Sequence, residues 1–542
     1  MRRPGFPRLV AAAAAAMLVL AGCDTLGGHV SVGSDGGSGA SDGGTTSASA
    51  AATPALPEVG TSAATLSVDP ATDEAYSSYY SQNLDWQPCE EYRSAQCATL
   101  VVPRVWNDPS AGDISLAMLR IPATGEKKGS LLMNPGGPGG SGVSFVGESS
   151  ASIVSEGVRS SYDLIGFDPR GVASSTGIRC LTDAETDEYL SADYDMTTPE
   201  GVKTGEEWTK RVAEACEKNS ADMLGVIDTE SAARDMDVMR AAVGSEKLDY
   251  LGFSYGTYLG ATYAELYPQR TGRLVLDGAI DPTLTSDQMA RGQAEGFEYA
   301  IHNFATSCLA AGSSTCPLTG TEDEAVQQIR DFFTATDAQP VRTGDPNRPL
   351  TGSLARSGVL VGLYNDANYP YVIQGLKNAK AGDGSLLLYL ADLAAERNDD
   401  GTYTGNGNFS IIGVNCLDHP AIEDQAWMAK EAKDLAASYP TFGGQMGYSG
   451  LTCSMWPEGP VREPAPIHAS GSAPIVVIGT TGDPATPYPW AQALAEQLDE
   501  GTLITWKGQG HTAYGRSGGC VEQAVDAFLL EGTVPEDGLT CG

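Results

Sequence analysis

Short apolar runs alternate with segments of helical spacing between residues 97 and 276. The runs are rich in Val, Ile, Leu and Thr, which predicts β-strands at 97–102, 114–121, 130–133, 162–167, 248–252 and 273–276. Around the last two strands the apolar residues fall three or four positions apart, which predicts helices at 229–243 and 258–267. Strands and helices that alternate in this way predict an α/β fold with a mostly parallel, doubly wound sheet.

The spacing of apolar residues becomes mainly helical after Pro282 and stays so up to about His468. Strand and helix signals then return, at 474–478, 489–498, 502–506 and 523–530. A helical insertion between two strands of one sheet is typical of a cap or lid. We therefore predict one α/β core split by a helical cap, with the parts at 75–285, 286–468 and 469–542. No repeat of fixed period is visible, which excludes solenoids and propellers.

The N-terminus carries the pattern of an export signal. Basic residues precede an apolar run at 9–20, which is too short to span a bilayer as a finished helix. The run ends in Leu-Ala-Gly-Cys, which resembles a bacterial lipobox and implies cleavage before Cys23 and acylation of its thiol. We therefore predict a lipoprotein signal peptide at 1–23. An ordinary signal peptide with a chance cysteine is the alternative.

Residues 24–74 are predicted to form a flexible tether. From Asp24 to about Ala64 the chain is mostly Gly, Ser, Ala and Thr, so it cannot bury enough apolar surface to offset the entropy of ordering. Such a tether behind an acylated Cys23 would hold a globular domain away from the membrane. We expect an exported protein that is lipid-anchored to the cell membrane and faces outside the cytoplasm.

The cysteines indicate an oxidising compartment. Beyond Cys23 the chain has an even number of them, which in an exported protein favours disulfides. The ten candidates are Cys89, Cys97, Cys180, Cys216, Cys308, Cys316, Cys416, Cys453, Cys520 and Cys541. Pairing sequence neighbours would close short local loops, although the sequence leaves the connectivity open. No CxxC pair is present and no histidine clusters with the cysteines, so we expect no zinc site and no cofactor.

The formal net charge is −36, from 69 acidic and 33 basic residues. Nucleic acids and anionic lipids bind basic surfaces, so the charge argues against both as partners. An acidic surface also keeps an exported protein soluble, which is our preferred interpretation. A field that favours cationic substrates, such as peptides with a free amine, is the alternative.

Gly252-Phe-Ser-Tyr-Gly256 has the form G-x-S-x-G between a predicted strand and a predicted helix. In this motif the serine occupies a strained turn, and glycines let neighbouring backbones pass closely. The hydroxyl then projects at the N-terminus of a helix, where the dipole favours developing negative charge. We predict Ser254 as a nucleophile. A glycine-rich turn without chemistry is the alternative.

A serine hydroxyl needs a base to become nucleophilic. Of the five histidines, His511 follows the strand predicted at 502–506 and lies in a glycine-lined loop before the last helix. His419, within the insertion, is the rival. The remaining histidines lie in the tether, in a helical stretch of the cap and at a proline-rich boundary: His29, His302 and His468.

The base needs a carboxylate that orients its imidazole. Asp483 follows the strand predicted at 474–478, and it precedes His511 by a gap that fits one helix and one strand. Asp277, at the end of the preceding strand, is the alternative. Asp168 comes before the serine in the chain, so we interpret it as a structural carboxylate near Arg170.

Acyl transfer also needs two backbone N–H groups that face the oxyanion. One is expected from Tyr255, the residue after the nucleophile. The second is expected from the glycine-rich loop at 134–142, whose prolines lack an N–H. The candidates are Gly136, Gly137, Gly139 and Gly140. The loop lacks the G-K-[ST] ending of a Walker motif, and a proline interrupts any G-x-G-x-x-G pattern, which argues against a nucleotide site.

Four blocks of sequence together resemble a known family: NPGGPGGSG at 134–142, GFDPRG at 166–171, LGFSYGTYLG at 251–260 and GDPATP at 482–487. They are similar to blocks of the tripeptidyl-aminopeptidase-like secreted hydrolases of actinobacteria, which are relatives of the prolyl aminopeptidases. The likeness spans roughly residues 83–542 and is faint through the cap.

The resemblance implies an α/β-hydrolase fold with a helical cap and the release of short peptides from free N-termini. It matches Ser254, Asp483 and His511 with the family's triad, and Gly137 and Tyr255 with its oxyanion donors. The partners it implies are peptide substrates. A carboxylesterase or lipase on the same triad is the first alternative, because the motifs specify acyl transfer and not the leaving group. A non-catalytic envelope lipoprotein is the second.

Overall fold

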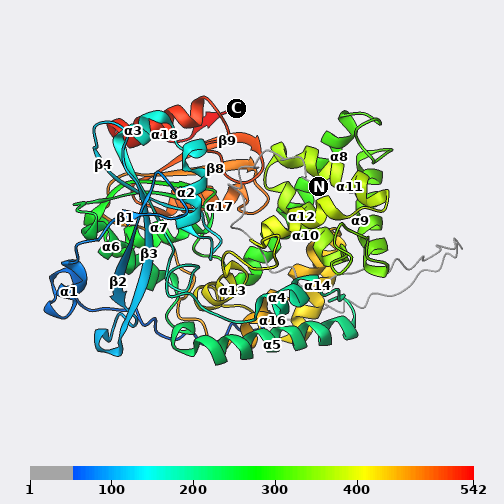
Figure 1. Cartoon of the computed structure of the whole chain (residues 1–542), viewed down its shortest axis with the longest axis horizontal. Coiled ribbons are helices and arrows are strands. Elements are labelled where there is room, and N and C mark those ends of the chain that lie inside the picture. Colours follow the sequence, from blue (N-terminus) through cyan, green and yellow to red (C-terminus); the bar gives the residue numbers. More distant parts are fainter. Residues whose placement is uncertain (1–52) are drawn as a thin grey trace, which may run out of the picture.

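The computed structural model describes residues 53–542 (Figure 1). Within that part of the chain, one ten-stranded sheet has the order β1-β2-β3-β5-β4-β6-β7-β8-β9-β10. The strands are β1 (Gln87–Pro88), β2 (Gln96–Pro103), β3 (Asp113–Ile121), β4 (Gly129–Asn134), β5 (Tyr162–Phe167), β6 (Leu248–Phe253), β7 (Thr271–Asp277), β8 (Ile475–Gly482), β9 (Gly501–Gln509) and β10 (Leu539–Cys541).

The sheet is parallel from β5 through β4, β6, β7, β8 and β9 to β10, and antiparallel only at the β1-β2-β3-β5 end. The predicted α/β fold with a mostly parallel sheet is therefore confirmed. All eight predicted strands are present, and β1 and β10 are additional. In parallel strands the carboxyl ends lie at one edge, so β4, β6, β7, β8 and β9 deliver their following loops to the same place.

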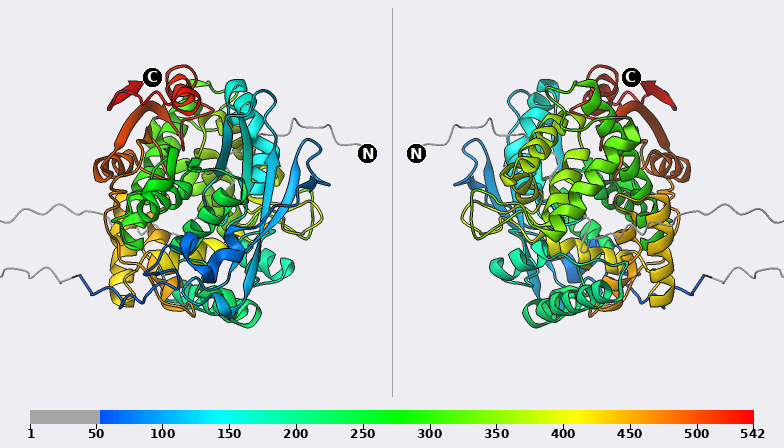
Figure 2. Two further views of the ribbon diagram at one scale, coloured as in Figure 1. Left: turned by 90° about the vertical axis from the view of Figure 1, so that its left-hand side faces the viewer. Right: turned by 90° about the vertical axis from the view of Figure 1, so that its right-hand side faces the viewer.

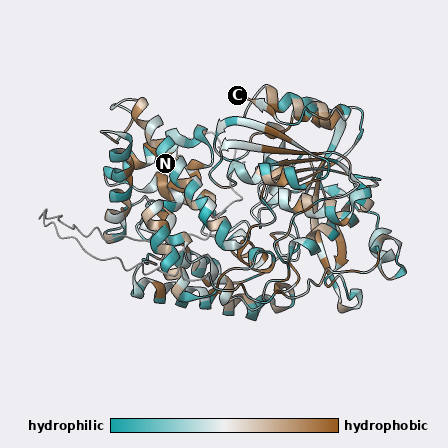
Figure 3. Ribbon diagram, turned by 180° about the vertical axis from the view of Figure 1, so that it is seen from behind, coloured by the Kyte–Doolittle hydropathy of each residue, from teal (hydrophilic) through white to brown (hydrophobic). Residues whose placement is uncertain are grey.

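Helices cover both faces of the sheet. Side chains alternate along each strand, so that Tyr250 and Leu276 join one buried cluster and Leu251 and Val275 join another. The first cluster packs under α6 (Thr229–Ala242), α7 (Tyr255–Leu266) and α17 (Tyr488–Gln497). The second packs under α2 (Gly142–Ile153), α3 (Glu156–Ser161) and α18 (Cys520–Glu531). The central strands are mostly hydrophobic in Figure 3, as expected for a sheet buried on both faces.

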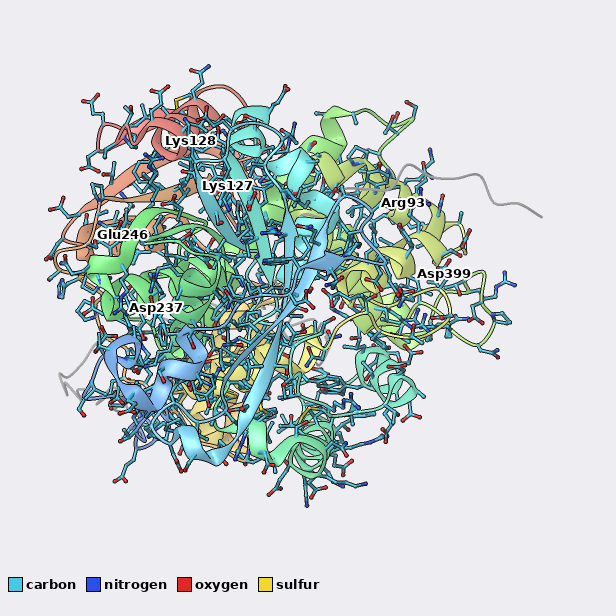
Figure 4. The ribbon with its side chains drawn as sticks, turned by 60° about the vertical axis from the view of Figure 1, so that its left-hand side comes forward. Arg93, Lys127, Lys128, Asp237, Glu246 and Asp399 are labelled. Atoms are coloured by element: carbon cyan, nitrogen blue, oxygen red, sulfur yellow. A yellow bond between two sulfur atoms is a disulfide. The ribbon has the colours of Figure 1, made fainter. Side chains whose placement is uncertain are left out.

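Several charged side chains lie at the amino ends of the parallel strands, opposite the edge where the strands end. Lys127 and Lys128 precede β4, and Glu246 precedes β6; all three lie on one side of the molecule in Figure 4. Lys128 Nζ donates to Leu530 O at 3.1 Å. This amino edge lies away from the loops that follow the parallel strands.

The segment predicted as a cap, residues 286–468, contains helices and no strand of the sheet. It lies beside the sheet and extends away from it (Figure 1, Figure 2). Many of its apolar side chains form a separate buried cluster. Its helices are α8 (Ser286–Ala310), α9 (Glu322–Ala338), α10 (Gly352–Leu363), α11 (Tyr369–Lys380), α12 (Ser385–Ala394), α13 (Gly407–Asp418), α14 (Gln425–Ser438), α15 (Gly443–Met446) and α16 (Ser449–Ser454).

A second excursion, which the sequence analysis did not predict, leaves the core between β5 and α6. It consists of α4 (Asp183–Ser191) and the long α5 (Pro199–Leu224), which runs beneath α16 in Figure 1. Several of the side chains that α5 buries join the main core cluster, among them Val212, Cys216 and Leu224.

The end of the predicted tether is part of the folded core, and the predicted boundary at 74 is corrected. Ser62 and Ala64 are buried, and Ser62 Oγ donates to Asp228 Oδ1 at 2.9 Å. Gly60 N donates to Pro460 O at 2.8 Å. These contacts satisfy backbone and side-chain groups that a free segment would leave in water. The signal peptide and Cys23 lie outside the described residues.

The ten cysteines form five disulfides, each between sequence neighbours: Cys89–Cys97, Cys180–Cys216, Cys308–Cys316, Cys416–Cys453 and Cys520–Cys541. Each closes a local loop, the longest spanning 37 residues, so the disulfides restrain single excursions rather than link distant parts. From residue 53 onward, no helix combines the length and the apolar character that a membrane span requires.

Candidate active site

Ser254 occupies a strained turn between β6 and α7. Its backbone has φ 56° and ψ −123°, a conformation that a non-glycine residue adopts only when its surroundings enforce it. A Cβ on Gly252 would lie 2.4 Å from the carbonyl oxygen of Gly256, so the turn requires glycine there. Ser254 N donates to Asp277 O at 2.9 Å. The turn therefore holds the hydroxyl at the N-terminus of α7.

His511 and Asp483 form a close pair in the loops after β9 and β8. Both carboxylate oxygens of Asp483 lie 2.9 Å from His511 Nδ1. The carboxylate also accepts hydrogen bonds from the N–H groups of Ala485, Thr486 and Thr512. Because Asp483 is buried and its oxygens are occupied, it holds Nδ1 protonated and fixes the plane of the imidazole.

The pairing leaves His511 Nε2 as the nitrogen with a lone pair. Within residues 53–542 this atom is buried and has no hydrogen-bond partner, Ser254 Oγ included. The strand register brings the serine turn and the loops after β8 and β9 to the same edge of the sheet. Phe253 pairs with Asp277, and Asp277 pairs with Ile478. A Cβ on Gly278 would lie 3.1 Å from His511 Cε1, so the imidazole sits directly over the end of β7.

Asp277, the alternative acid, serves the loop rather than the imidazole. Its carboxylate accepts the N–H of Ala513 at 3.0 Å and the N–H of Tyr514 at 2.7 Å, just after His511. Burial raises the pKa of Asp277 to about 7, against the opposing effect of these donors and of His511. The geometry thus separates the two carboxylates: Asp483 contacts the ring, and Asp277 anchors the backbone that carries it.

Asp168 is a structural carboxylate, as expected, and its partners are loop and helix groups rather than Arg170. It accepts from Ser141 Oγ at 2.6 Å and from Val143 N at 3.1 Å, at the start of α2. Arg170 instead makes a buried two-pronged pair with Asp235, with both contacts at 2.7 Å. A fork-shaped guanidinium favours this partner because two parallel hydrogen bonds satisfy it at once.

The glycine-rich loop after β4 packs against the serine turn. A Cβ on Gly136 would lie 2.9 Å from Ser254 Cβ and 3.0 Å from Tyr255 N. Two of the four candidate donors are already used, because Gly136 N donates to Asn134 Oδ1 and Gly140 N donates to Gly136 O.

Of the remaining candidate donors, Gly137 lines the cavity that holds Ser254 and Tyr255. Its φ of 115° is accessible to glycine and strained for other residues. Tyr255 is the first residue of α7, where an N–H has no acceptor within the helix. Gly137 and Tyr255 are thus the pair of backbone donors that the geometry favours.

The cavity beside Ser254 has a volume of about 170 Å³. The sheet edge contributes Gly137, Ser254, Tyr255 and Thr486, and the helical insertion contributes most of the opposite wall. That wall combines apolar side chains with neutral polar ones: Met289, Gln293, Ile412, Asn415, Met446 and Tyr448. Among the described residues that line it, none carries a carboxylate, a guanidinium or an ammonium group.

The rival base His419 lines the same cavity but does not contact an acid. Its Nδ1 donates to Leu284 O at 3.2 Å. His302 pairs with Glu322 on an outer face of α8, and His468 Nδ1 donates to Gln497 O. Only His511, among the histidines that the structure describes, has a carboxylate partner within the loops that follow the sheet.

Three further features of the site were not predicted, although Thr486 lies in the GDPATP block at 482–487. Tyr364, in the helical insertion, accepts His511 N on its carbonyl at 2.7 Å and presents its ring edge-on to the imidazole. Thr486 Oγ1 donates to Asp483 Oδ2 at 3.0 Å. Arg516 donates to the carbonyl oxygens of Gln509, His511 and Thr512, and so fixes the loop. Tyr364 and His511 are distant in the chain, and Arg516 belongs to none of the quoted motifs.

A buried chain of hydrogen bonds ties the insertion to the serine turn. The hydroxyls of Tyr255 and Thr229 lie 2.6 Å apart, and Thr229 Oγ1 donates to Asp418 Oδ2 at 2.6 Å. Asp418 is the last residue of α13, and burial raises its pKa to about 7, with Asp228 adding to the shift. The side chain of the residue after Ser254 is thereby fixed by the helical insertion.

Comparisons with known proteins agree with this geometry. A family model described as "TAP-like protein" matches residues 439–541. Serine protease Hip1 of Mycobacterium tuberculosis is 37% identical over 484 residues, which cover 85% of this chain and 91% of the relative. Carboxylesterase B of the same species is 37% identical, with 84% and 89% covered. Tripeptidyl aminopeptidase of Streptomyces coelicolor is 30% identical, with 84% and 86% covered.

Proposed function

From the premise that this chain belongs to the tripeptidyl-aminopeptidase-like (TAP-like) family of α/β hydrolases and is a serine hydrolase, we propose that it cleaves peptides through an acyl-enzyme on Ser254. The observation that supports this most directly is the Asp483–His511 pair at 2.9 Å. The pair leaves His511 Nε2 unpartnered, and two residues that contact the imidazole, Tyr364 and Thr486, line the cavity with Ser254.

In the proposed reaction, Ser254 Oγ attacks the carbonyl carbon and passes its proton to His511 Nε2. The N–H groups of Gly137 and Tyr255 bind the oxyanion, a contribution of about 3–4 kcal/mol per donor. The bond to the leaving amine breaks as Nε2 returns the proton to the amine nitrogen. Water then adds to the acyl ester with Nε2 as base, and Ser254 Oγ leaves with the proton. Asp483 stays ionised and stabilises the imidazolium.

The finer proposal is an aminopeptidase that releases short peptides from free N-termini. Its support is the identity of 30% to a relative named tripeptidyl aminopeptidase. A carboxylesterase is the second candidate, because a relative named carboxylesterase B is as similar to this chain as Hip1 is. Acyl transfer to water is common to both.

A substrate panel separates these candidates. The full chain would be assayed with peptidyl anilides that have free or acetylated N-termini, and with p-nitrophenyl esters of short acids. An aminopeptidase needs the free amine, an endopeptidase accepts the acetylated peptides, and an esterase hydrolyses esters alone. A fluorophosphonate probe that fails to label Ser254 in the active protein would refute the serine assignment itself.

We also propose that the protein is exported and anchored by a lipid on Cys23. The signal at residues 1–23 supports export, and the five disulfides are consistent with an oxidising compartment. Metabolic labelling with an alkyne fatty acid tests the anchor. Label should enter the wild type and be lost in Cys23→Ala, and label retained in that variant would contradict the proposal.

A further inference from the structure

His419 is a buried histidine that lines the cavity of Ser254 but has no part in the proposed reaction. Its side chain is 3% exposed, and it follows α13 at the base of the helical insertion. Buried polar groups in folded proteins are usually hydrogen-bonded, to the protein or to a ligand. We therefore ask which group could bind the imidazole of His419 within this cavity.

The hydrogen bonding of His419 fixes its tautomer. A carbonyl oxygen can only accept, so the contact of Nδ1 with Leu284 O at 3.2 Å places the proton on Nδ1. Nε2 then carries the lone pair. Burial lowers the pKa of His419 to about 4, and Arg462 acts in the same direction. The ring is therefore a neutral acceptor at physiological pH, even with the carboxyl group of Asp418 adjacent in the chain.

Ring contacts place His419 beside α7, the helix that follows Ser254. Its ring lies 5.2 Å from the ring of Tyr258, centroid to centroid. Tyr258 follows Tyr255 by about one helical turn on the same side of α7, and those two rings are 6.4 Å apart. His419 therefore lies beside α7 and lines the same cavity of about 170 Å³ as Ser254 and Tyr255.

The rest of the wall explains why one neutral acceptor would matter. Because no charged group is found among the described residues that line it, this lining offers a substrate only its shape and neutral hydrogen bonds. Recognition then depends on shape and on neutral hydrogen bonds. An acceptor that is left unpaired in a buried site costs about 1–3 kcal/mol, so it discriminates against ligands that lack the matching donor.

We propose that His419 is a specificity-determining residue whose Nε2 accepts a hydrogen bond from a backbone N–H group of the bound peptide. The inference rests on the proposed peptidase function and deepens it. Peptides carry N–H groups on either side of the scissile bond, whereas simple esters have none there. His419 would therefore make the site favour peptides over esters of similar shape.

The test is a scan of N-methylated peptides against two variants. In the full-length wild type, methylation of one particular nitrogen should lower kcat/KM by about tenfold or more, the loss expected for an unpaired buried acceptor. In His419→Phe, which keeps an aromatic ring against Tyr258, that penalty should fall to less than about twofold while the unmethylated peptide is cleaved more slowly. His419→Gln, which retains an acceptor, should keep part of the penalty.

The control is His468→Phe, an equivalent change at an exposed position outside the cavity, which should leave the scan unchanged. The inference is overturned if methylation at every nitrogen costs the wild type and His419→Phe the same. The proposed function fails in a different way, when the wild type hydrolyses p-nitrophenyl esters at Ser254 but cleaves none of the peptides. Should His419→Phe not fold, as judged by its melting temperature, the comparison of His419→Gln with wild type decides.

Discussion

The sheet edge and the helical insertion build the same cavity in opposite ways. At the edge, each chemical group follows a strand within a few residues and is held by short, buried, charge-bearing contacts such as Asp483 with His511. In the insertion, the wall is assembled from separate helices, including α8, α13 and α16, and its lining side chains are neutral. The comparison teaches that the proposed catalytic groups follow from local patterns, whereas the wall opposite them depends on tertiary packing.

The largest expected effect concerns the edge. Ser254→Ala removes the nucleophile, so kcat/KM for any substrate should fall by at least about 10⁴-fold. The melting temperature should stay close to that of the wild type, because the Ser254 hydroxyl makes no hydrogen bond to His511 Nε2. Steady-state kinetics and thermal denaturation measure both quantities.

The matched control for that experiment is Ser286→Ala, which removes a hydroxyl from the insertion side of the same cavity. It should keep turnover within a few-fold of the wild type. Equal losses in the two variants would mean that the edge is not the centre of the chemistry.

The next prediction separates the two carboxylates of the edge. Asp483→Asn should lower kcat by about 10⁴-fold, because an amide no longer enforces the tautomer of His511 or stabilises its imidazolium. Asp277→Asn should lower kcat less but destabilise the protein by about 1–3 kcal/mol. Ala513 N lies 3.0 Å from both carboxylate oxygens, so the NH₂ group of an amide would face this N–H donor whichever way the amide is turned.

Urea denaturation and kcat would be measured for both variants side by side. The assignment of Asp483 is contradicted if Asp277→Asn is the variant with the greater catalytic loss. Thr486→Val would sharpen the result further, since it removes only the hydroxyl that supports Asp483.

The same contrast explains how far the sequence alone could lead. Eight strands and the residues after them were predictable, because a G-x-S-x-G turn at Ser254 and a glycine-lined loop at His511 are local patterns with local causes. The excursion through α4 and α5 was not predictable, because α5 carries many charged residues and its apolar side chains pack on core residues that are distant in the chain. The contact of Tyr364 with His511 joins residues far apart in the chain, and no short motif specifies it.

The glycine-rich loop shows the limit within a single motif. Its residue types left Gly136, Gly137, Gly139 and Gly140 open as oxyanion donors, and only the resemblance to the family singled out Gly137. The fold separates them, because the N–H groups of Gly136 and Gly140 are used inside the loop. That information lies in backbone angles and not in residue types.

A smaller effect is expected where the two regions join. Thr229→Val removes the hydroxyl between Tyr255 and Asp418. It should lower kcat about tenfold and change KM less than about twofold. The reason is that this hydrogen-bond chain positions Tyr255, the proposed oxyanion donor. Thr229→Ser keeps the hydroxyl and should restore most of kcat. A merely structural role would lower the melting temperature of the valine variant while its kcat matched that of the wild type.

The smallest effect is a pH dependence of stability at the same junction. Asp418 titrates near 3.8 in the unfolded chain and near 7 in the folded one, because it is buried and close to Asp228. A raised pKa means that the folded state holds the proton more tightly. Its contribution to stability is therefore complete below about pH 4 and is lost as the pH rises through 7.

Asp418→Asn keeps this side chain neutral at every pH, and its amide can donate to Thr229 Oγ1 while that hydroxyl turns toward Tyr255. The stability of the wild type relative to this variant should decline by at most about 4 kcal/mol between pH 4 and pH 8, as measured by urea denaturation. Asp399→Asn, an exposed change of the same charge, should leave the slope unaltered. If the free energy of unfolding changed with pH in the same way in the wild type and in Asp418→Asn, the prediction would be contradicted. The pKa of Asp418 would then be the same in the folded and unfolded chains.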